Sequence, residues 1–124
     1  MHEASIALDL IRVAETVALE YSSDRVLALT VRIGQWAAVV PEALQAAFPA
    51  CAEGTLLEGA QLSIETVPGV GLCPLHGRVA LELQRGLHCP VCDAPTPELL
   101  QGDELELDAV ELAGGTAGEN ERIQ

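Results

Sequence analysis

Four residues able to bind a metal lie in two short, similar motifs in the second half of the chain. The first motif pairs Cys73 with His76, and the second pairs Cys89 with Cys92 after twelve intervening residues. Each motif predicts a tight turn that aims two side chains at one point, and one tetrahedral ion would join the two turns. Three thiolates and an imidazole suit Zn(II) and disfavour magnesium or calcium. The spacing therefore predicts a structural zinc site.

The same residues have other interpretations. A thioredoxin-like redox motif places its two cysteines at the N-terminus of a helix after a strand, whereas these motifs flank a short alternating segment. Two disulfides would need an oxidising compartment, and no N-terminal sequence directs the chain there. His88 is the rival of His76, but it adjoins Cys89 and lies outside the paired spacing. Cys51 has no partner in the sequence and is expected to be a small buried residue.

The N-terminal tripeptide Met1-His2-Glu3 is a second candidate metal site. The imidazole of His2 lies close to the α-amine and to the first backbone amides, and these nitrogens together can surround a metal in one plane. Planar nitrogen coordination selects Ni(II) or Cu(II) over Zn(II). Taken alone, an N-terminal Met-His is more commonly a solvated chain end, so the tripeptide is weak evidence for a site.

Composition and charge exclude several classes of function. The 124 residues include six Lys and Arg and carry a formal net charge of −13. Binding to phosphate backbones depends on clustered cations, so neither nucleic acids nor anionic membranes are expected partners. No apolar run reaches the ~18 residues of a membrane span, no signal peptide is expected, and thiolate ligands need reduced cysteines. The sequence therefore predicts a cytoplasmic protein.

Hydrophobic periodicity predicts the elements that must position these sites. Residues Ser5 to Tyr21 have an apolar stripe at helical spacing. Val40-Pro41-Glu42 opens a second helix, in which Pro49 predicts a kink or a break. Strands are predicted at Val26–Gly34, Leu62–Val67 and Glu104–Leu112.

The metal-binding motifs interrupt this helix and strand pattern. Arg78–Leu83 alternates and predicts a hairpin strand with its turn near Arg85-Gly86. The alternation of the last strand slips between Leu107 and Val110, which predicts a β-bulge. The predicted fold is α+β, with a small three-stranded sheet and two helices interrupted by a zinc-ribbon-like module. The expected boundaries are 1–68 plus 103–112 for a discontinuous α/β domain, 69–102 for the module, and 113–124 for a disordered tail.

Short motifs follow one another in a specific order along the chain. They are Met1-His2-Glu3, Arg32-Ile33-Gly34, Val40-Pro41-Glu42-Ala43-Leu44 with Phe48, Gly54-Thr55-Leu56, Glu58-Gly59-Ala60 and the paired Cys/His motifs. Each piece is weak evidence, but the order and spacing together are specific. In this order they resemble the HypA/HybF family of nickel metallochaperones, over residues 1 to 112.

The resemblance implies a protein without catalysis that helps to insert nickel into [NiFe] hydrogenases and, in some members, serves urease. It implies a Ni(II) site built from His2 and nearby backbone nitrogens, with Glu3 contributing and the Met1 amine available. It implies a structural Zn(II) site formed by Cys73, His76, Cys89 and Cys92. The implied partners are an accessory GTPase and the hydrogenase large subunit, together with urease accessory proteins where urease is served.

Two positions depart from the family pattern. His76 stands where the first motif usually has a second cysteine, and Pro49 interrupts a helix that is normally continuous. The alternative function is a zinc-ribbon adaptor in which His2 is incidental. An enzyme is less favoured, because the sequence shows no Gly-rich phosphate loop and no Ser/His/Asp set. Four protein ligands would also leave zinc no open position for water.

Overall fold

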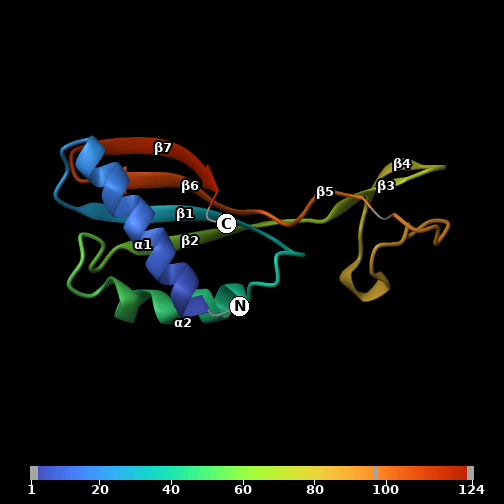
Figure 1. Ribbon diagram of the computed structural model, residues 1–124, viewed down its shortest axis with the longest axis horizontal. Helices are drawn as coiled ribbons and strands as arrows, with labels where there is room; N and C mark the ends of the chain where they lie inside the picture. The colour runs from blue at the N-terminus through green and yellow to red at the C-terminus, as the bar shows by residue number, and fades with distance from the viewer. Residues whose placement is uncertain (1–2, 97, 123–124) are drawn as a thin grey trace.

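The computed structural model describes residues 3–96 and 98–122. The elements in chain order are α1 (Glu3–Glu20), β1 (Val26–Gly34), α2 (Pro41–Ala52), β2 (Gln61–Val67), β3 (Val70–Cys73), β4 (Gly77–Ala80), the 3-10 helix η1 (Leu83–Arg85), β5 (Leu99–Gln101), β6 (Leu105–Leu112) and β7 (Gly115–Arg122). The strands form a four-stranded sheet in the order β2-β1-β6-β7 and a separate three-stranded sheet in the order β4-β3-β5 (Figure 1). None of the described helices has the length and apolar character needed to cross a membrane.

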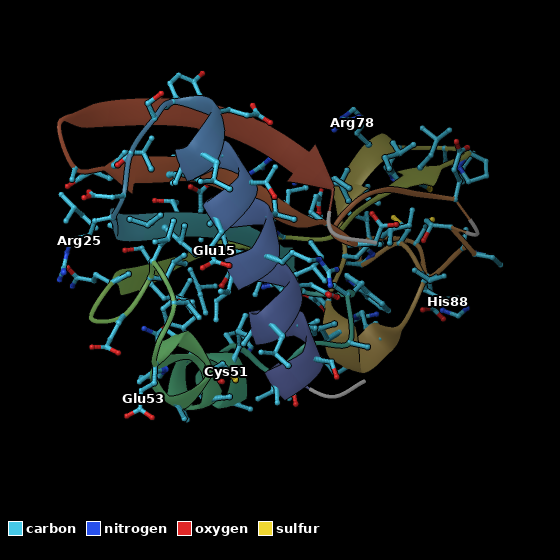
Figure 2. The ribbon with its side chains drawn as sticks, turned by 60° about the vertical axis from the view of Figure 1, so that its left-hand side comes forward. Glu15, Arg25, Cys51, Glu53, Arg78 and His88 are labelled. Atoms are coloured by element: carbon cyan, nitrogen blue, oxygen red, sulfur yellow. The ribbon has the colours of Figure 1, made fainter. Side chains whose placement is uncertain are left out.

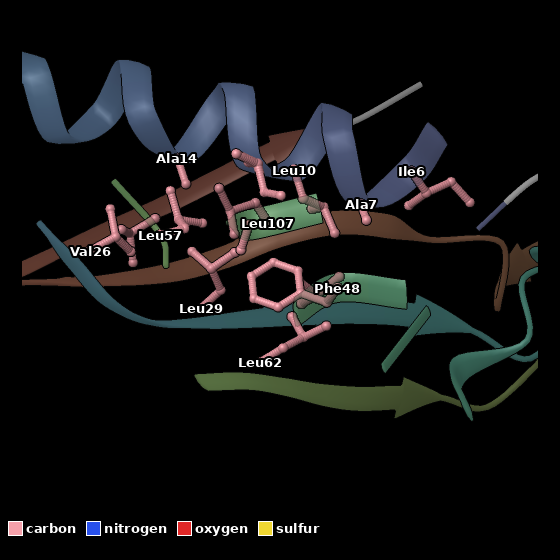
Figure 3. Packing of buried hydrophobic residues seen from close by; sticks show 14 of the residues in the cluster. Ile6, Ala7, Leu10, Ala14, Val26, Leu29, Phe48, Leu57, Leu62 and Leu107 are labelled. Carbon is pink, nitrogen blue, oxygen red and sulfur yellow. The ribbon is translucent and has the colours of Figure 1, made fainter. Parts of the chain in front are cut away.

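Helices α1 and α2 and strands β1, β2 and β6 share the main hydrophobic core. The expected apolar stripe of α1 packs inward, with Ile6, Leu10 and Val17 buried. Figure 3 shows the ring of Phe48, from α2, beside Leu29 of β1 and the neighbouring strand β2. Because the chain has one Phe, one Trp and one Tyr, aliphatic side chains supply most of this core. The α+β class and its two helices are confirmed.

Strand β1 is central in the larger sheet. It pairs in parallel with β2 and antiparallel with β6. Thr30 lies opposite Ala109 while Val31 lies opposite Leu107, so Asp108 is an extra residue on β6. This is the β-bulge that the slipped alternation predicts.

The expected disordered tail is wrong for residues 115–122. This segment forms β7, which pairs antiparallel with β6 from Leu112 opposite Gly115 to Glu106 opposite Arg122. The larger sheet therefore has four strands rather than the expected three. The strand forms although its sequence lacks apolar alternation, because a hairpin lets β6 supply the backbone hydrogen-bond partners. Residues 123 and 124 of the expected tail lie outside the described residues.

Helix α2 is continuous through Pro49, so the expected break is absent. The helix opens with Pro41 in its first turn, as the sequence predicts. Pro49 lies in the last turn and is exposed, and its ring removes one helical hydrogen bond, the one that a backbone N–H would donate to the Gln45 carbonyl. Leu44 and Phe48 of the same helix remain buried in the core.

Two linkers connect the sheets, residues 68–69 and residues 102–104. They are held together beside the end of β1. The backbone N–H of Trp36 donates to the carbonyl of Gly102 at 2.7 Å, and the side-chain amide of Gln101 donates to the carbonyl of Pro68 at 3.0 Å. Leu81 N–H donates to the Gly69 carbonyl at 2.9 Å. These bonds join both linkers to one another and to the larger sheet. The domain boundaries themselves remain predictions.

Candidate metal centre

The first Cys/His motif is the turn of a hairpin. Strands β3 and β4 pair antiparallel with Cys73 opposite Gly77, so the three residues between them make the turn that carries His76. Gly77 has a φ of 70°, in the region that glycine adopts without strain. The hairpin therefore fixes both side chains of the first motif near the tip of the smaller sheet.

The hairpin expected over Arg78–Leu83 is wrong in position. Strand β4 ends at Ala80, and Leu83–Arg85 forms the 3-10 helix η1 instead of leading to a strand turn. The partner of β4 is Val70–Cys73, a four-residue strand too short to be recognised from alternation. The turn of the hairpin is the metal motif itself.

The second motif forms a similar turn without strands on either side. Asp93 N–H donates to the Cys89 carbonyl at 2.8 Å, and Asp93 has a φ of 62°. It takes the place that Gly77 has in the first turn, and Asp tolerates this left-handed conformation better than most residues. No helix follows Cys92 in the described part of the chain up to Thr96, so the thioredoxin-like arrangement is absent there.

The structure brings the ligand atoms of both motifs together. The Sγ and ring nitrogen atoms of Cys73, His76, Cys89 and Cys92 all lie within 4.8 Å of one another. His76 Nδ1 is 3.6 Å from the Sγ atoms of Cys73 and Cys89. The Sγ atoms of Cys73 and Cys92 are also 3.6 Å apart. Ligand atoms around a tetrahedral ion held at zinc-like bond lengths are about 3.5–3.8 Å apart, so these four residues fit such an ion.

Backbone amides support the two buried sulfur atoms. Leu75 N–H donates to Cys73 Sγ at 3.4 Å, and Val91 N–H donates to Cys89 Sγ at 3.4 Å. In both turns, the backbone N–H of the second residue after the first cysteine donates to the sulfur of that cysteine. Such donors stabilise a thiolate more than a thiol. Sequence spacing identifies the cysteines but does not identify these amide donors.

The thiols of the cluster differ in acidity. Burial raises the pKa of Cys73, but backbone hydrogen bonds from His76 and Leu75 outweigh it and hold the pKa below its ordinary value. The pKa of Cys89 is likewise lowered, with burial opposed by backbone N–H donors in its own turn. At Cys92 the Ala94 N–H lowers the pKa, but burial and the two neighbouring thiols raise it overall. A cation among the sulfur atoms would offset that crowding of negative charge.

The remaining cysteine and the rival histidine lie outside the cluster. His88 Nδ1 is 3.1 Å from the Arg85 carbonyl oxygen, and Figure 2 shows His88 at the outer edge of the module. Cys51 is partly buried on α2, with Sγ 4.0 Å from the Ala4 carbonyl oxygen. All four cysteines are free. The geometry thus favours His76 over His88 as the fourth ligand.

The candidate nickel site is described only at Glu3, because Met1 and His2 lie outside the described residues. The Glu3 carboxylate accepts a hydrogen bond from the backbone N–H of Val40 at 3.3 Å. Val40 immediately precedes α2, so this bond links the first residue of α1 to the start of α2. No sequence pattern indicates that the N–H of Val40 needs a side-chain acceptor, so this contact with Glu3 cannot be predicted from the sequence.

Comparison with known proteins places this architecture in a family. Residues 1–112 match the family described as "HypA: Hydrogenase/urease nickel incorporation, metallochaperone, hypA". The hydrogenase maturation factor HypA of Deinococcus radiodurans is 72% identical over 107 residues, covering 86% of this chain and 89% of the relative. The HypA of Chloroflexus aurantiacus is 46% identical over 112 residues, covering 90% and 98%.

Solved structures agree on the fold. The solution structure of the Ni metallochaperone HypA from Helicobacter pylori matches with a TM-score of 0.65 and 23% identity, covering 90% of this chain and 97% of that one. Strand β7 lies beyond the part of the chain that the family match covers. With its two helices, its small sheets, its four-residue Cys/His metal site and these relatives, the chain belongs to the HypA family.

Proposed function

We propose that this chain is a nickel metallochaperone that binds Ni(II) at its N-terminus and helps to deliver it during [NiFe] hydrogenase maturation. The observation that carries the proposal is the match of residues 1–112 to a nickel-incorporation family, since this range includes Met1-His2-Glu3. Delivery is ligand exchange with a partner and involves no catalysis.

Nickel is the cargo, and its ligands are the nitrogen atoms of the chain end. The Met1 amine, the His2 imidazole and the first backbone nitrogens supply a planar nitrogen set. The Glu3 carboxylate is occupied by the Val40 N–H, which supports a role for Glu3 through its backbone nitrogen and through anchoring the chain end. A site at a chain end suits a carrier, because its ligands can leave one at a time.

The Cys/His cluster is proposed to hold a structural Zn(II). Its donors match zinc in type, number and spacing, with Cys73 and Cys89 buried and His76 and Cys92 exposed. When bound, the ion joins the two turns to each other. Because all four ligands come from the chain, no position remains for substrate or reactive water.

The proposed partners are the accessory GTPase of hydrogenase maturation and the hydrogenase large subunit, with urease accessory proteins as further candidates. The proposed compartment is the cytoplasm, where the cysteines stay reduced. The alternative function is a zinc-ribbon adaptor. It is favoured by two exposed apolar residues at the tips of the metal turns, Leu75 and Val91, which are 78% and 71% exposed.

Nickel titration with a native chain end separates the two functions. The zinc-loaded protein is titrated with Ni(II) by calorimetry, once with Met1 free and once with a short Gly-Ser extension before Met1. A nickel carrier of the proposed kind binds about one equivalent through the free end and binds more weakly, or with altered absorption, when extended. Equal binding by both forms would contradict the N-terminal site and favour the adaptor.

A further inference from the structure

A groove lies between the start of α2 and the outer edge of the larger sheet. It has a volume of about 500 Å³ and is lined by Pro41, Glu42, Gln45, Ala46, Ile64 and Thr66. Strand β2 is the edge strand here, because the sheet order is β2-β1-β6-β7. The groove therefore has a helix on one side and, on the other, a strand that pairs with one neighbour among the described residues.

The backbone of β2 presents hydrogen-bonding groups to this groove. Gln45 Nε2 donates to the Leu62 carbonyl at 2.8 Å, from the side of β2 that faces away from β1. On the other side, the Val67 carbonyl accepts from Gln35 N–H at 2.9 Å. Backbone groups alternate sides along a strand, so the N–H and C=O of Ile64 and Thr66 point the same way as those of Leu62. They form a short open edge along the groove.

The groove adjoins the proposed nickel end. Pro41 lines it, and the preceding residue, Val40, donates its N–H to Glu3 at 3.3 Å. Val40 is itself 53% exposed. A molecule seated along β2 would therefore end close to the residue that follows His2. An interaction here would place a nickel donor or acceptor beside the cargo.

Charge and pairing restrict what can fill the groove. Glu42 is exposed on its wall and has no ion pair in the described part of the chain, while the whole chain carries a net charge of −13. A second copy of the chain would bring the same acidic charge and be repelled. The described segment after β6 already pairs at the opposite edge of the sheet. The groove thus fits an extended segment from a different protein with a basic side chain.

We propose that a nickel-exchanging partner docks here by adding a strand to β2, with its main chain bonded to Ile64 and Thr66 and a Lys or Arg beside Glu42. Main-chain bonds supply affinity in such strand addition, and the small apolar wall formed by Pro41, Ala46 and Ile64 accommodates alternate side chains. The charge of Glu42 mainly increases the association rate. The proposal rests on the proposed function, because it takes the partner to be one that supplies or receives nickel.

A proline substitution tests the main-chain contact. Thr66→Pro removes one outward N–H, which an edge strand tolerates, whereas Thr66→Ala keeps that N–H and removes only the side chain. The probes are the purified accessory GTPase and hydrogenase large subunit from the same organism, tested by calorimetry. Thr66→Pro is expected to weaken binding of one of them by about tenfold, the equivalent of about 1.4 kcal/mol, while Thr66→Ala leaves it nearly unchanged.

A charge reversal tests the polar contact. Glu42→Lys is expected to slow association and to reduce its salt dependence. Glu53→Lys is the matched control, since it makes the same charge change just beyond the other end of α2 (Figure 2). Equal effects of the two reversals would show a general charge effect and contradict a contact at Glu42.

Amide hydrogen exchange on the unmodified protein provides a readout that needs no variant. In the complex, exchange at Ile64 and Thr66 is expected to slow, while Ser63 and Glu65, whose N–H groups face β1, stay unchanged. The proposal would be overturned if both Thr66 variants lost the same amount of binding, or if amide exchange along β2 did not slow in the alternating pattern. It would also be overturned if neither probe bound the wild-type chain. Nickel titration of the same samples judges the proposed function separately, because the groove variants leave Met1 and His2 unchanged.

Discussion

The indole ring of Trp36 fills the space that a side chain at Gly69 would occupy. Gly69 is buried in the linker that leads from β2 to β3, and Trp36 follows the end of β1. A methyl group at Gly69 would overlap the pyrrole edge of the indole. The ring also lies against Gly102, in the returning linker. One side chain thus packs between the two connections to the metal module, and the glycines are required by its size.

Gly69→Ala is therefore expected to lower the free energy of unfolding by about 1–3 kcal/mol, the usual cost of overpacking. Because Trp36 is the sole tryptophan, its emission should also shift to longer wavelength as the ring is displaced. Urea unfolding and fluorescence measure the two effects. In a Trp36→Ala background the cost of Gly69→Ala should be much smaller, and strictly additive costs would contradict the contact.

Pro49→Ala is expected to stabilise the protein by about 1–3 kcal/mol, because it restores an amide donor in the last turn of α2 and removes the ring from a helical position. Pro41→Ala is the matched control at the other end of the same helix. Proline is favourable in the first turn, so that change should have an effect of about 0.5 kcal/mol or less. Equal shifts in urea midpoint for both variants would contradict this account of α2.

His76→Ala should weaken zinc binding by about a hundredfold or more, since four ligands share a binding free energy of about 10–16 kcal/mol. His88→Ala should retain zinc, because the His88 ring lies at the Arg85 carbonyl rather than in the cluster. His76→Cys should restore binding. Competition with a chromophoric chelator measures all three, and a larger loss in His88→Ala would reverse the ligand assignment.

Acid is expected to release the zinc, because protons compete with the metal for every ligand. In the metal-free cluster the pKa of Cys92 is raised by burial and the neighbouring thiols, while hydrogen bonds from backbone N–H groups lower those of Cys73 and Cys89. Proton competition is therefore expected to be strongest at Cys92. Zinc affinity should therefore decrease steadily with decreasing pH. Chelator competition at stepped pH values measures the trend, with His76→Cys as the comparison. An affinity that is constant or increases on acidification would contradict it.

The sequence predicts much of this architecture, because several local rules agree with the tertiary structure. The strand over Val26–Gly34 has the predicted bounds, and the slipped alternation of β6 corresponds to the bulge at Asp108. The paired motif spacing brings Cys73, His76, Cys89 and Cys92 together. In each case a short-range pattern carries the information.

The features that the sequence does not predict depend on long-range partners. Strand β7 has no apolar alternation of its own and forms by pairing with β6. The contact between Trp36 and Gly69 joins residues more than thirty positions apart, and glycine offers no side chain whose pattern could reveal it. The bond from Val40 N–H to Glu3 likewise depends on how α1 and α2 pack.

Nickel is proposed to bind at His2, and Ni(II) titration of untagged, zinc-loaded His2→Ala tests this most directly. The variant loses the imidazole and should lose nickel binding, while its zinc content and urea midpoint match those of the wild type. His88→Ala, which removes a histidine elsewhere, should bind nickel like the wild type. Unchanged nickel affinity in His2→Ala would contradict the account and leave the zinc-ribbon adaptor as the better description.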